Sequence, residues 1–260
     1  MTKSRYPFVS ALVTGASSGI GEEITRQLRA GGVSVVVAAR RTDRLDALAA
    51  ELGGVEVITA DLATRDGQDT VADRIREDAR PIDLVVNNAG FGTSGDFTAA
   101  DPDRLASEIE VNVAALTRLS HAALSVMVPR QRGWLLNVSS VASFQPAPHL
   151  AVYAATKAYV TSLTESLREE VKKSGVKVTA LCPGLTGTEF QSVSNTEGYQ
   201  SALPGFMWTT VEQVAAAGLA DVANGRTLSI PGTLYKALAG VSSVTPRSVL
   251  RMASNVVPRK

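Results

Sequence analysis

The sequence predicts an α/β fold built on a parallel sheet, and three observations carry that prediction. Apolar, β-branched runs of strand length alternate along the chain with amphipathic segments of helical length. These runs are apolar almost throughout, which is typical of strands that are buried on both faces, as in parallel sheets. The first run also passes through a glycine-rich turn directly into a helical segment, which is the order of a βαβ unit.

The composition indicates one domain, residues 1–260, that binds a small molecule. With 260 residues, 45% of them hydrophobic, the chain is long enough for one large core. The formal net charge of +1 argues against nucleic acid or an anionic membrane as a partner. One cysteine, Cys182, and two histidines are too few for a disulfide and make a metal site improbable. No apolar run approaches the ~18 residues of a membrane span and the N-terminus has no signal pattern, so we expect a cytoplasmic protein without an integral membrane segment.

The first predicted strand, residues 8–14, leads into the turn GASSGIG at 15–21 and then into a helical segment, EEITRQLRAGG. Gly15, Gly19 and Gly21 suit a tight turn, close approach of a pyrophosphate and close packing of helix on strand. The start of the helix offers free N–H groups and the positive end of its dipole. A nucleotide phosphate is therefore expected here, with Ser17, Ser18 and Ile20 beside the glycines; the alternative is an ordinary turn between strand and helix.

The second predicted strand, residues 33–39, indicates which cofactor would bind. An acidic residue about 20 positions after the glycines would bind the ribose 2′-hydroxyl of NAD, whereas arginine accommodates the 2′-phosphate of NADP. Here the strand ends at Ala39 and is followed by Arg40 and Arg41. NADP(H) is the expected cofactor, with Arg40 as first choice for the phosphate and Arg41 as second. The alternative is a solvated basic pair at the start of the helix predicted at 42–52.

Two further strands are predicted at 55–62 and 81–90, separated by a helix that ends near residue 79. The third strand ends at Asp61 and Leu62, and the fourth closes on Asn87, Asn88, Ala89 and Gly90. The carboxyl ends of parallel strands line the ligand crevice of such a sheet, so small amides and a glycine there could bind a base or ribose. The alternative is turn chemistry, which asparagine and glycine also favour.

The residues with acid–base chemistry follow in the next two units. A long helix is predicted at 101–128, enclosing Asn112, and the strand at 134–140 ends in a serine pair. Tyr153 and Lys157 share one face of the helix predicted at 150–174, and an adjacent ammonium is expected to lower the pKa of the phenol. With the Ser140 hydroxyl brought beside it by the strand end to hold a substrate oxygen, such a phenol could protonate that oxygen. The two groups would then make a carbonyl-reducing site if a hydride donor were near. The alternative is an ordinary pair on a helix surface.

The last part of the chain closes the predicted crevice. A sixth strand, 176–182, is broken by Pro183 and Gly184 and followed by Thr186 and Thr188, where a ring could lie over the crevice. Residues 189–208 have no clean period and are expected to form a movable lid over the substrate. A helix at 211–223 and a short strand at 227–231 follow, and residues 233–260 are expected to be a helical tail. That tail could pack on the domain, in a subunit interface or on a membrane surface.

The ordered set TGASSGIG, NNAG, Asn112, Ser140, YAATK and CPG, between residues 8 and 190, resembles the short-chain dehydrogenase/reductase family. The resemblance implies a Rossmann-type, doubly wound sheet of seven parallel strands in the order 3-2-1-4-5-6-7. Helices would cover both faces of this sheet in a three-layer αβα sandwich. It also implies a homodimer or homotetramer, formed by pairing the helices that hold Asn112 and Tyr153.

By the same resemblance, Tyr153 is the general acid/base, and Lys157 lowers its pKa and binds the nicotinamide ribose. Ser140, rather than Ser139, holds the substrate oxygen, and Asn112 completes a proton relay. The cofactor would be contacted by a further set: Asp61 and Asn88 at the adenosine, Thr186 and Thr188 at the nicotinamide or pyrophosphate. Two departures from the family pattern are Thr186, where Val or Ile is usual, and LSIPG at 228–232, where Asp-Gly-Gly is common.

The predicted function is therefore NADPH-dependent reduction of a ketone, reversible in principle, on a lipophilic substrate such as a 3-oxoacyl chain or a steroid. The alternative is a regulatory protein that binds NADP(H) without turnover. The lipophilic substrate is suggested by a mostly apolar set of residues expected to include pocket residues: Phe91, Phe97, Phe144, His149, Phe190, Tyr199, Phe206, Met207 and Trp208.

Overall fold

The computed structural model describes residues 4–195, 204–246 and 248–250. Seven strands form one parallel sheet: β1 (Ser10–Thr14), β2 (Ser34–Ala39), β3 (Val55–Thr59), β4 (Leu84–Asn87), β5 (Trp134–Val138), β6 (Lys177–Leu181) and β7 (Leu228–Ser229). The α-helices of the described residues are α1 (Gly19–Ala30), α2 (Thr42–Leu52), α3 (Arg65–Arg76), α4 (Pro102–Ile109), α5 (Leu116–Met127), α6 (Ala151–Glu170), α7 (Phe190–Val193), α9 (Val211–Ala223) and α10 (Thr233–Val244).

The sheet has the order β3-β2-β1-β4-β5-β6-β7, which confirms the expected doubly wound topology. The order reverses at β1, where Val13 lies between Val37 of β2 and Val86 of β4. Chain segments leave β1 and β4 in opposite directions, and the resulting crevice at the carboxyl ends of the strands is where α/β sheets bind ligands.

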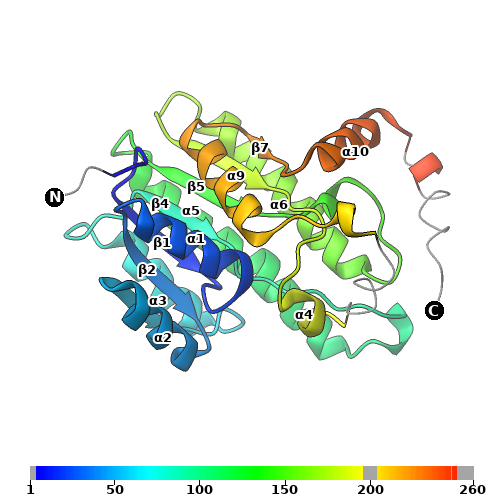
Figure 1. The fold of residues 1–260 in the computed structure, drawn as a ribbon, viewed down its shortest axis with the longest axis horizontal. Coiled ribbons are helices and arrows are strands. Elements are labelled where there is room, and N and C mark those ends of the chain that lie inside the picture. Colours follow the sequence, from blue (N-terminus) through cyan, green and yellow to red (C-terminus); the bar gives the residue numbers. More distant parts are fainter. Residues whose placement is uncertain (1–3, 196–203, 247, 251–260) are drawn as a thin grey trace.

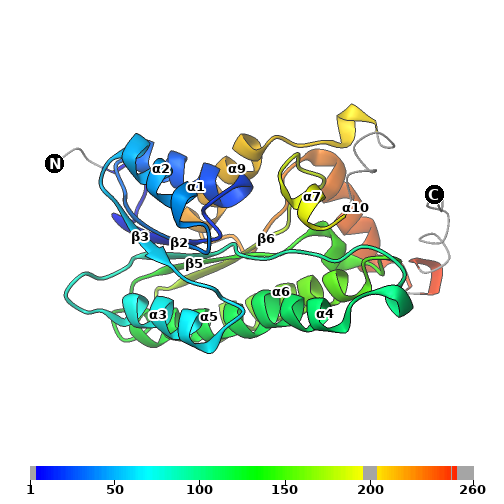
Figure 2. The same cartoon turned by 90° about the horizontal axis from the view of Figure 1, so that it is seen from below.

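Helices cover both faces of this sheet (Figures 1 and 2). Figure 2 shows α1, α2 and α9 on one side and α3, α5 and α6 on the other, which makes the three-layer sandwich that the sequence predicts. In none of the described segments is a helix long and apolar enough to cross a membrane.

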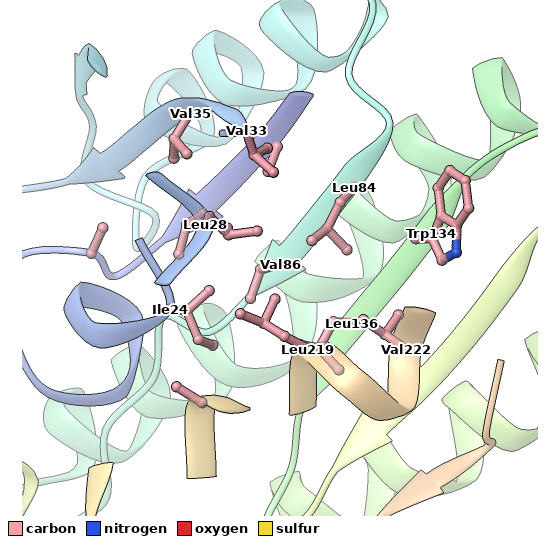
Figure 3. Close-up of a cluster of buried hydrophobic side chains, with 14 of the residues drawn as sticks. Ile24, Leu28, Val33, Val35, Leu84, Val86, Trp134, Leu136, Leu219 and Val222 are labelled. Carbon is pink, nitrogen blue, oxygen red and sulfur yellow. The ribbon is translucent and has the colours of Figure 1, made fainter. Parts of the chain in front are cut away.

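The continuous apolar strands are explained by two hydrophobic clusters, one on each face of the sheet. Along β1, Val13 belongs to the cluster under α1 and α9, whereas Leu12 belongs to the cluster above α3 and α5. Figure 3 shows the first cluster, in which Ile24 and Leu28 of α1 and Leu219 of α9 lie over the sheet. Both faces of each central strand are thus removed from water, which explains why the strand sequences do not alternate between apolar and polar residues.

The helix predicted at 101–128 is interrupted. A π-helical turn, Glu110–Ala115, separates α4 from α5 and contains the buried Asn112. The Asn112 amide donates to the Phe91 carbonyl (2.8 Å) and to the Thr156 hydroxyl (3.1 Å), and its oxygen accepts from the Phe91 N–H (3.1 Å). Turns of this kind occur frequently at functional sites. The mid-helix asparagine therefore fastens the loop after β4 to α6.

Candidate active site

The glycine turn after β1 forms one wall of a cleft of about 480 Å³. Gly15 has φ +66°, and a Cβ there would lie 2.8 Å from the Ala89 Cα. A Cβ at Gly21 would lie 2.5 Å from the Gly15 carbonyl oxygen, so Gly21 allows α1 to pack against the turn. Helix α1 begins at Gly19 without a side-chain cap, which leaves its first N–H groups available to an anion.

Most of the sequence-predicted site residues line this one cleft. The structure brings together Gly15, Ser17, Ser18, Gly19, Ile20, Arg40, Arg41, Asp61, Leu62, Asn88, Ala89, Gly90, Ser140, Tyr153, Lys157, Pro183, Gly184, Thr186 and Thr188. Gly21 and Asn112 do not line it: the first packs α1 on the turn, and the second braces the loop below. Within the described residues no group of His, Cys, Asp or Glu side chains could hold a metal ion.

Tyr153 lines the cleft from the first turn of α6. It is 9% exposed, and its burial raises the pKa of the phenol to about 12, which the nearby Ser140 hydroxyl partly offsets. The phenol is therefore neutral at pH 7 and holds a proton that it can donate. The Ser140 hydroxyl itself accepts from the Ala142 N–H (3.1 Å) and lines the cleft.

Lys157 lies one turn further along α6, and its position corrects one expectation. Its Nζ donates to the Val138 carbonyl (2.8 Å) and lies 5.7 Å from the centroid of the Tyr153 ring. Burial lowers the pKa of this ammonium to about 8. The predicted lowering of the Tyr153 pKa is wrong, because desolvation of the phenol and the negative charge of Glu108 both raise this pKa, and the Ser140 hydroxyl offsets only part of the rise.

The two serines at the end of β5 have different surroundings. Ser139 is buried, donates to the Lys157 carbonyl (2.8 Å) and shares a hydrogen bond with Thr161 (2.7 Å). Its hydroxyl is thus occupied in holding α6 against the strand. Both serines line the cleft, but Ser140 is the one that is only partly buried, in agreement with its spacing to the tyrosine.

The asparagine pair after β4 is also divided. Asn87 is buried and donates to Ser120 (3.1 Å) and Asn137 (2.9 Å), so the expectation that both amides face a base or ribose is wrong for this residue. Asn88 lines the cleft, but its amide donates to the carbonyls of Thr14 (3.0 Å) and Gly15 (3.2 Å). The alternating direction of side chains along an extended segment separates the two residues.

Arg40 and Arg41 both line the cleft, with different partners. Arg41 reaches over the glycine turn, where it donates to the hydroxyls of Ser17 (3.1 Å) and Ser18 (2.8 Å), and it forms an ion pair with Glu189 (2.8 Å). Arg40 is exposed and has no hydrogen-bond or ion-pair partner among the described residues. Arg41, the second choice from sequence, is therefore the one already oriented toward the turn.

The segment predicted as a lid is described at both ends, residues 189–195 and 204–208; residues 196–203, with Tyr199, lie outside the described chain. Its first part contains α7, whose Phe190 ring lies 5.2 Å from the Tyr153 ring. Of the predicted aromatic set, Phe91, Phe190 and Trp208 line the cleft. Phe97 and His149 instead line a smaller neighbouring cavity of about 170 Å³.

Sequence reasoning missed Glu108 on α4, a carboxylate behind the active site. The side chain is fully buried, and neither oxygen has a hydrogen-bond partner in the described parts of the chain. Burial raises the pKa of Glu108, which nearby Thr93, Arg104 and Lys157 partly offset. Its negative charge in turn raises the pKa of Tyr153. A glutamate in an amphipathic helix normally faces water, so the sequence held no signal for this position.

The tail predicted after residue 232 begins as a helix, α10, that packs beside the cleft. Its Tyr235 hydroxyl accepts from the Leu185 N–H (3.1 Å) and donates to the Met207 carbonyl (2.6 Å). Gly184 is needed beneath this ring, because a Cβ there would lie 2.1 Å from a ring carbon. Helix α10 therefore fixes the strand end after β6 to the end of the predicted lid; residues 251–260 lie outside the described chain.

Replacing Tyr235 with phenylalanine is expected to lower the free energy of unfolding by about 1–3 kcal/mol, because it leaves two backbone groups unpaired. Urea unfolding followed by circular dichroism measures this loss. Tyr159→Phe is the matched control, since the Tyr159 hydroxyl bonds only Thr117 on an exposed surface (2.9 Å). Equal unfolding energies for the two variants would show that α10 does not fasten the cleft as described.

The sheet has the doubly wound strand order, a glycine turn lies at its crevice, and α6 brings a buried tyrosine and lysine to the same cleft. Together these features define a nucleotide-dependent oxidoreductase. The family described as short chain dehydrogenase matches residues 10–198, and this chain belongs to the short-chain dehydrogenase/reductase family. It is an oxidoreductase of the NAD(P)-dependent kind that acts on alcohol and carbonyl groups.

Individual relatives agree with this assignment. A protein of Staphylococcus epidermidis described as an uncharacterized oxidoreductase is 36% identical over 179 residues, which cover 68% of this chain and 78% of the relative. A short-chain dehydrogenase from Sphingobium yanoikuyae, solved in complex with NADPH, is 33% identical with a TM-score of 0.81 and covers 92% of this chain and 97% of its own. A bulky-bulky ketone specific alcohol dehydrogenase from Comamonas testosteroni is 30% identical with a TM-score of 0.76, covering 92% of this chain and 95% of its own.

Proposed function

We propose that this protein is an NADPH-dependent reductase of lipophilic ketones, with Tyr153 as the proton donor. One observation carries the proposal: the neutral, buried phenol of Tyr153 stands beside the Ser140 hydroxyl in the cleft that the glycine turn opens. A proton donor, a hydroxyl that can hold a carbonyl oxygen and a phosphate-binding turn are thus placed in one crevice.

The turn fits a dinucleotide, because the side chains that would block a pyrophosphate are absent and the first N–H groups of α1 are uncapped. When bound, the nicotinamide would supply hydride to the carbonyl carbon. Ser140 would hold the carbonyl oxygen, and Tyr153 would give it the phenolic proton as negative charge develops there. Lys157 would bind the ribose and stabilise the phenolate left behind. Asn112 would hold the loop and α6 in place for the return of the proton.

The preference for NADPH rests on the strand end at β2. Ala39 offers no carboxylate to a ribose hydroxyl, and the guanidinium groups of Arg40 and Arg41 line the cleft on that side. A guanidinium can bind a 2′-phosphate with two charge-assisted hydrogen bonds. The NADPH complex of the Sphingobium yanoikuyae relative supports this proposal by analogy.

The double change Ala39→Asp with Arg40→Ala is expected to lower the ratio of kcat/KM for NADPH to that for NADH by roughly 10- to 100-fold or more. It removes one charged partner of the phosphate, worth ~1.5–3 kcal/mol, and adds a repulsion against it. Steady-state kinetics with both cofactors measure the ratio. Arg76→Ala, which removes an exposed arginine outside the cleft, is the control and should leave it unchanged. An unaltered ratio in the double variant would show that Arg40 is only a solvated residue.

A lipophilic substrate is favoured by the apolar residues Phe91, Phe190 and Trp208 around the cleft and by Val111, Val141 and Leu150 among them. The bulky-ketone specificity of the Comamonas testosteroni relative points in the same direction. Ketones with an acyl chain or a steroid ring system are therefore the first substrates to test.

The same proposal includes one domain over residues 1–260, a homodimer or homotetramer, and a cytoplasmic location. Light scattering on the purified protein measures the oligomeric state.

A further inference from the structure

Glu189, the residue just before α7, places its carboxylate between two arginines beside the glycine turn. Its Oε2 lies 2.8 Å from the Arg41 Nη1 and its Oε1 lies 3.3 Å from the Arg44 Nη1. The hydrogen bond from Arg41 holds the pKa of Glu189 below its usual value, so this carboxylate is charged at neutral pH. The ion pair joins the predicted lid to the end of β2.

The same guanidinium is bound to the phosphate-binding turn. Arg41 donates from Nε and Nη2 to the Ser17 hydroxyl (3.2 and 3.1 Å) and from Nη2 to the Ser18 hydroxyl (2.8 Å). Thr188, the residue before Glu189, packs against the same turn: a Cβ added at Gly19 would lie 3.2 Å from the Thr188 Cβ. Glu189 therefore supplies an anion on the side of the cleft where the proposed cofactor would bring its 2′-phosphate.

We propose that Glu189 is a specificity-determining residue that competes with the 2′-phosphate for Arg41, and so reduces the margin by which NADP(H) is preferred over NAD(H). The inference rests on the proposed function, since it takes the arginines as the 2′-phosphate site. Binding of NADP(H) must break or rearrange the Arg41–Glu189 ion pair, whereas binding of NAD(H), which has no phosphate there, leaves the pair in place.

A carboxylate and a phosphate make equivalent demands on a guanidinium, which explains the competition. Each can accept two parallel N–H hydrogen bonds from arginine. Here the Glu189 carboxylate accepts one, from the Arg41 Nη1, while Nε and Nη2 donate to Ser17 and Ser18. A charged carboxylate that stays nearby also repels the phosphate. Because the Arg41 and Glu189 side chains are 42% and 40% exposed, water and salt screen both effects, and a modest change in affinity is expected.

Removing the charge of Glu189 should leave the lid segment folded, because other residues hold it. The Gln191 amide donates to the Thr186 carbonyl (2.8 Å), and the Ser194 hydroxyl accepts from the Gly92 N–H (3.0 Å). Arg104 donates to the Val193 carbonyl. Glu189→Gln therefore tests the charge with little change of shape.

The experiment is a calorimetric titration of the full-length protein with NADP⁺ and with NAD⁺ at low and high salt. Glu189→Gln is expected to tighten NADP⁺ binding by about three- to tenfold at low salt and less at high salt, with the Kd for NAD⁺ within twofold. Glu212→Gln, which removes an exposed charge on α9 outside the cleft, should change neither Kd. An NADP⁺ Kd in Glu189→Gln that is unchanged or weaker would overturn the inference.

A second comparison locates the competition at Arg41. In the Arg41→Ala background, Glu189→Gln should change the NADP⁺ Kd by less than twofold, since the guanidinium for which the two anions compete is gone. The same tightening with and without Arg41 would contradict the inference and indicate a general effect of charge. If the unmodified protein binds NAD⁺ but not NADP⁺, both this inference and the proposed cofactor preference fall; if it binds NADP⁺ and Glu189→Gln has no effect, only this inference does.

Discussion

Replacing Tyr153 with phenylalanine is expected to reduce kcat for ketone reduction by about 10²- to 10⁴-fold, with the Kd for NADPH within about twofold of the unmodified value. The change deletes the proton donor and leaves the ring, which packs 5.2 Å from the Phe190 ring. Stopped-flow measurement of a single turnover, with NADPH binding measured separately, distinguishes loss of chemistry from loss of cofactor. The pKa of the phenol is about 12, so the phenol keeps its proton throughout the neutral range. The fold-reduction in kcat should therefore be the same at every neutral pH.

Tyr159→Phe is the matched control for this change, because it removes a hydroxyl from the same helix, α6, but from an exposed position. Its kcat should stay within twofold of the unmodified value. Turnover by Tyr153→Phe at an undiminished rate would rule out the phenol as proton donor.

Replacing Lys157 with alanine is expected to impair both catalysis and cofactor binding, because one ammonium serves two steps. Activity should fall below detection, and the Kd for NADPH should rise by roughly 10- to 100-fold with the loss of a charged hydrogen bond to the ribose. Burial lowers the pKa of Lys157 to about 8, so the ammonium is present below that pH and is lost as the pH rises through it. NADPH affinity of the unmodified protein should therefore weaken above a pH of about 8, and that of Lys157→Ala should not.

Two further variants make the lysine test interpretable. Lys157→Met fills the buried space of the side chain without its charge and should bind NADPH as weakly as Lys157→Ala does. Lys172→Ala, which removes an exposed lysine beyond the end of α6, should behave as the unmodified protein. Normal NADPH affinity in Lys157→Met would contradict the role of the ammonium at the ribose.

The fold could be predicted from the sequence because each central strand is buried on both faces. Val13 and Leu12 serve opposite hydrophobic clusters, and such pairs give the continuous apolar runs by which the strands are recognised. The seventh strand is the weakest prediction, since residues 227–231 are reduced to the two-residue β7. The Pro231 ring has no N–H to continue a ladder of hydrogen bonds.

The sequence predicted the parts of the site that depend on residue type, such as the glycines of the turn. It did not predict the properties that depend on how deeply a side chain is buried. Gly15 and Gly21 are required by contacts that any Cβ would violate. The pKa of Tyr153, by contrast, is set by desolvation, which a helical spacing of tyrosine and lysine does not reveal. Glu108 and Glu189 were missed because folding decides their surroundings: Glu108 is buried on α4, and Glu189 pairs with Arg41, which lies far away in the sequence.

The most direct test of the account is the oxidation of NADPH and of NADH by the unmodified protein over a panel of acyl ketones, steroids and quinones. Kinetic measurement of kcat/KM should give turnover of at least one lipophilic ketone, with NADPH preferred by roughly tenfold or more. That preference should disappear in Ala39→Asp with Arg40→Ala. A clear preference of the unmodified protein for NADH, or binding of NADPH with no turnover of any ketone in the panel, would contradict the function proposed for this site.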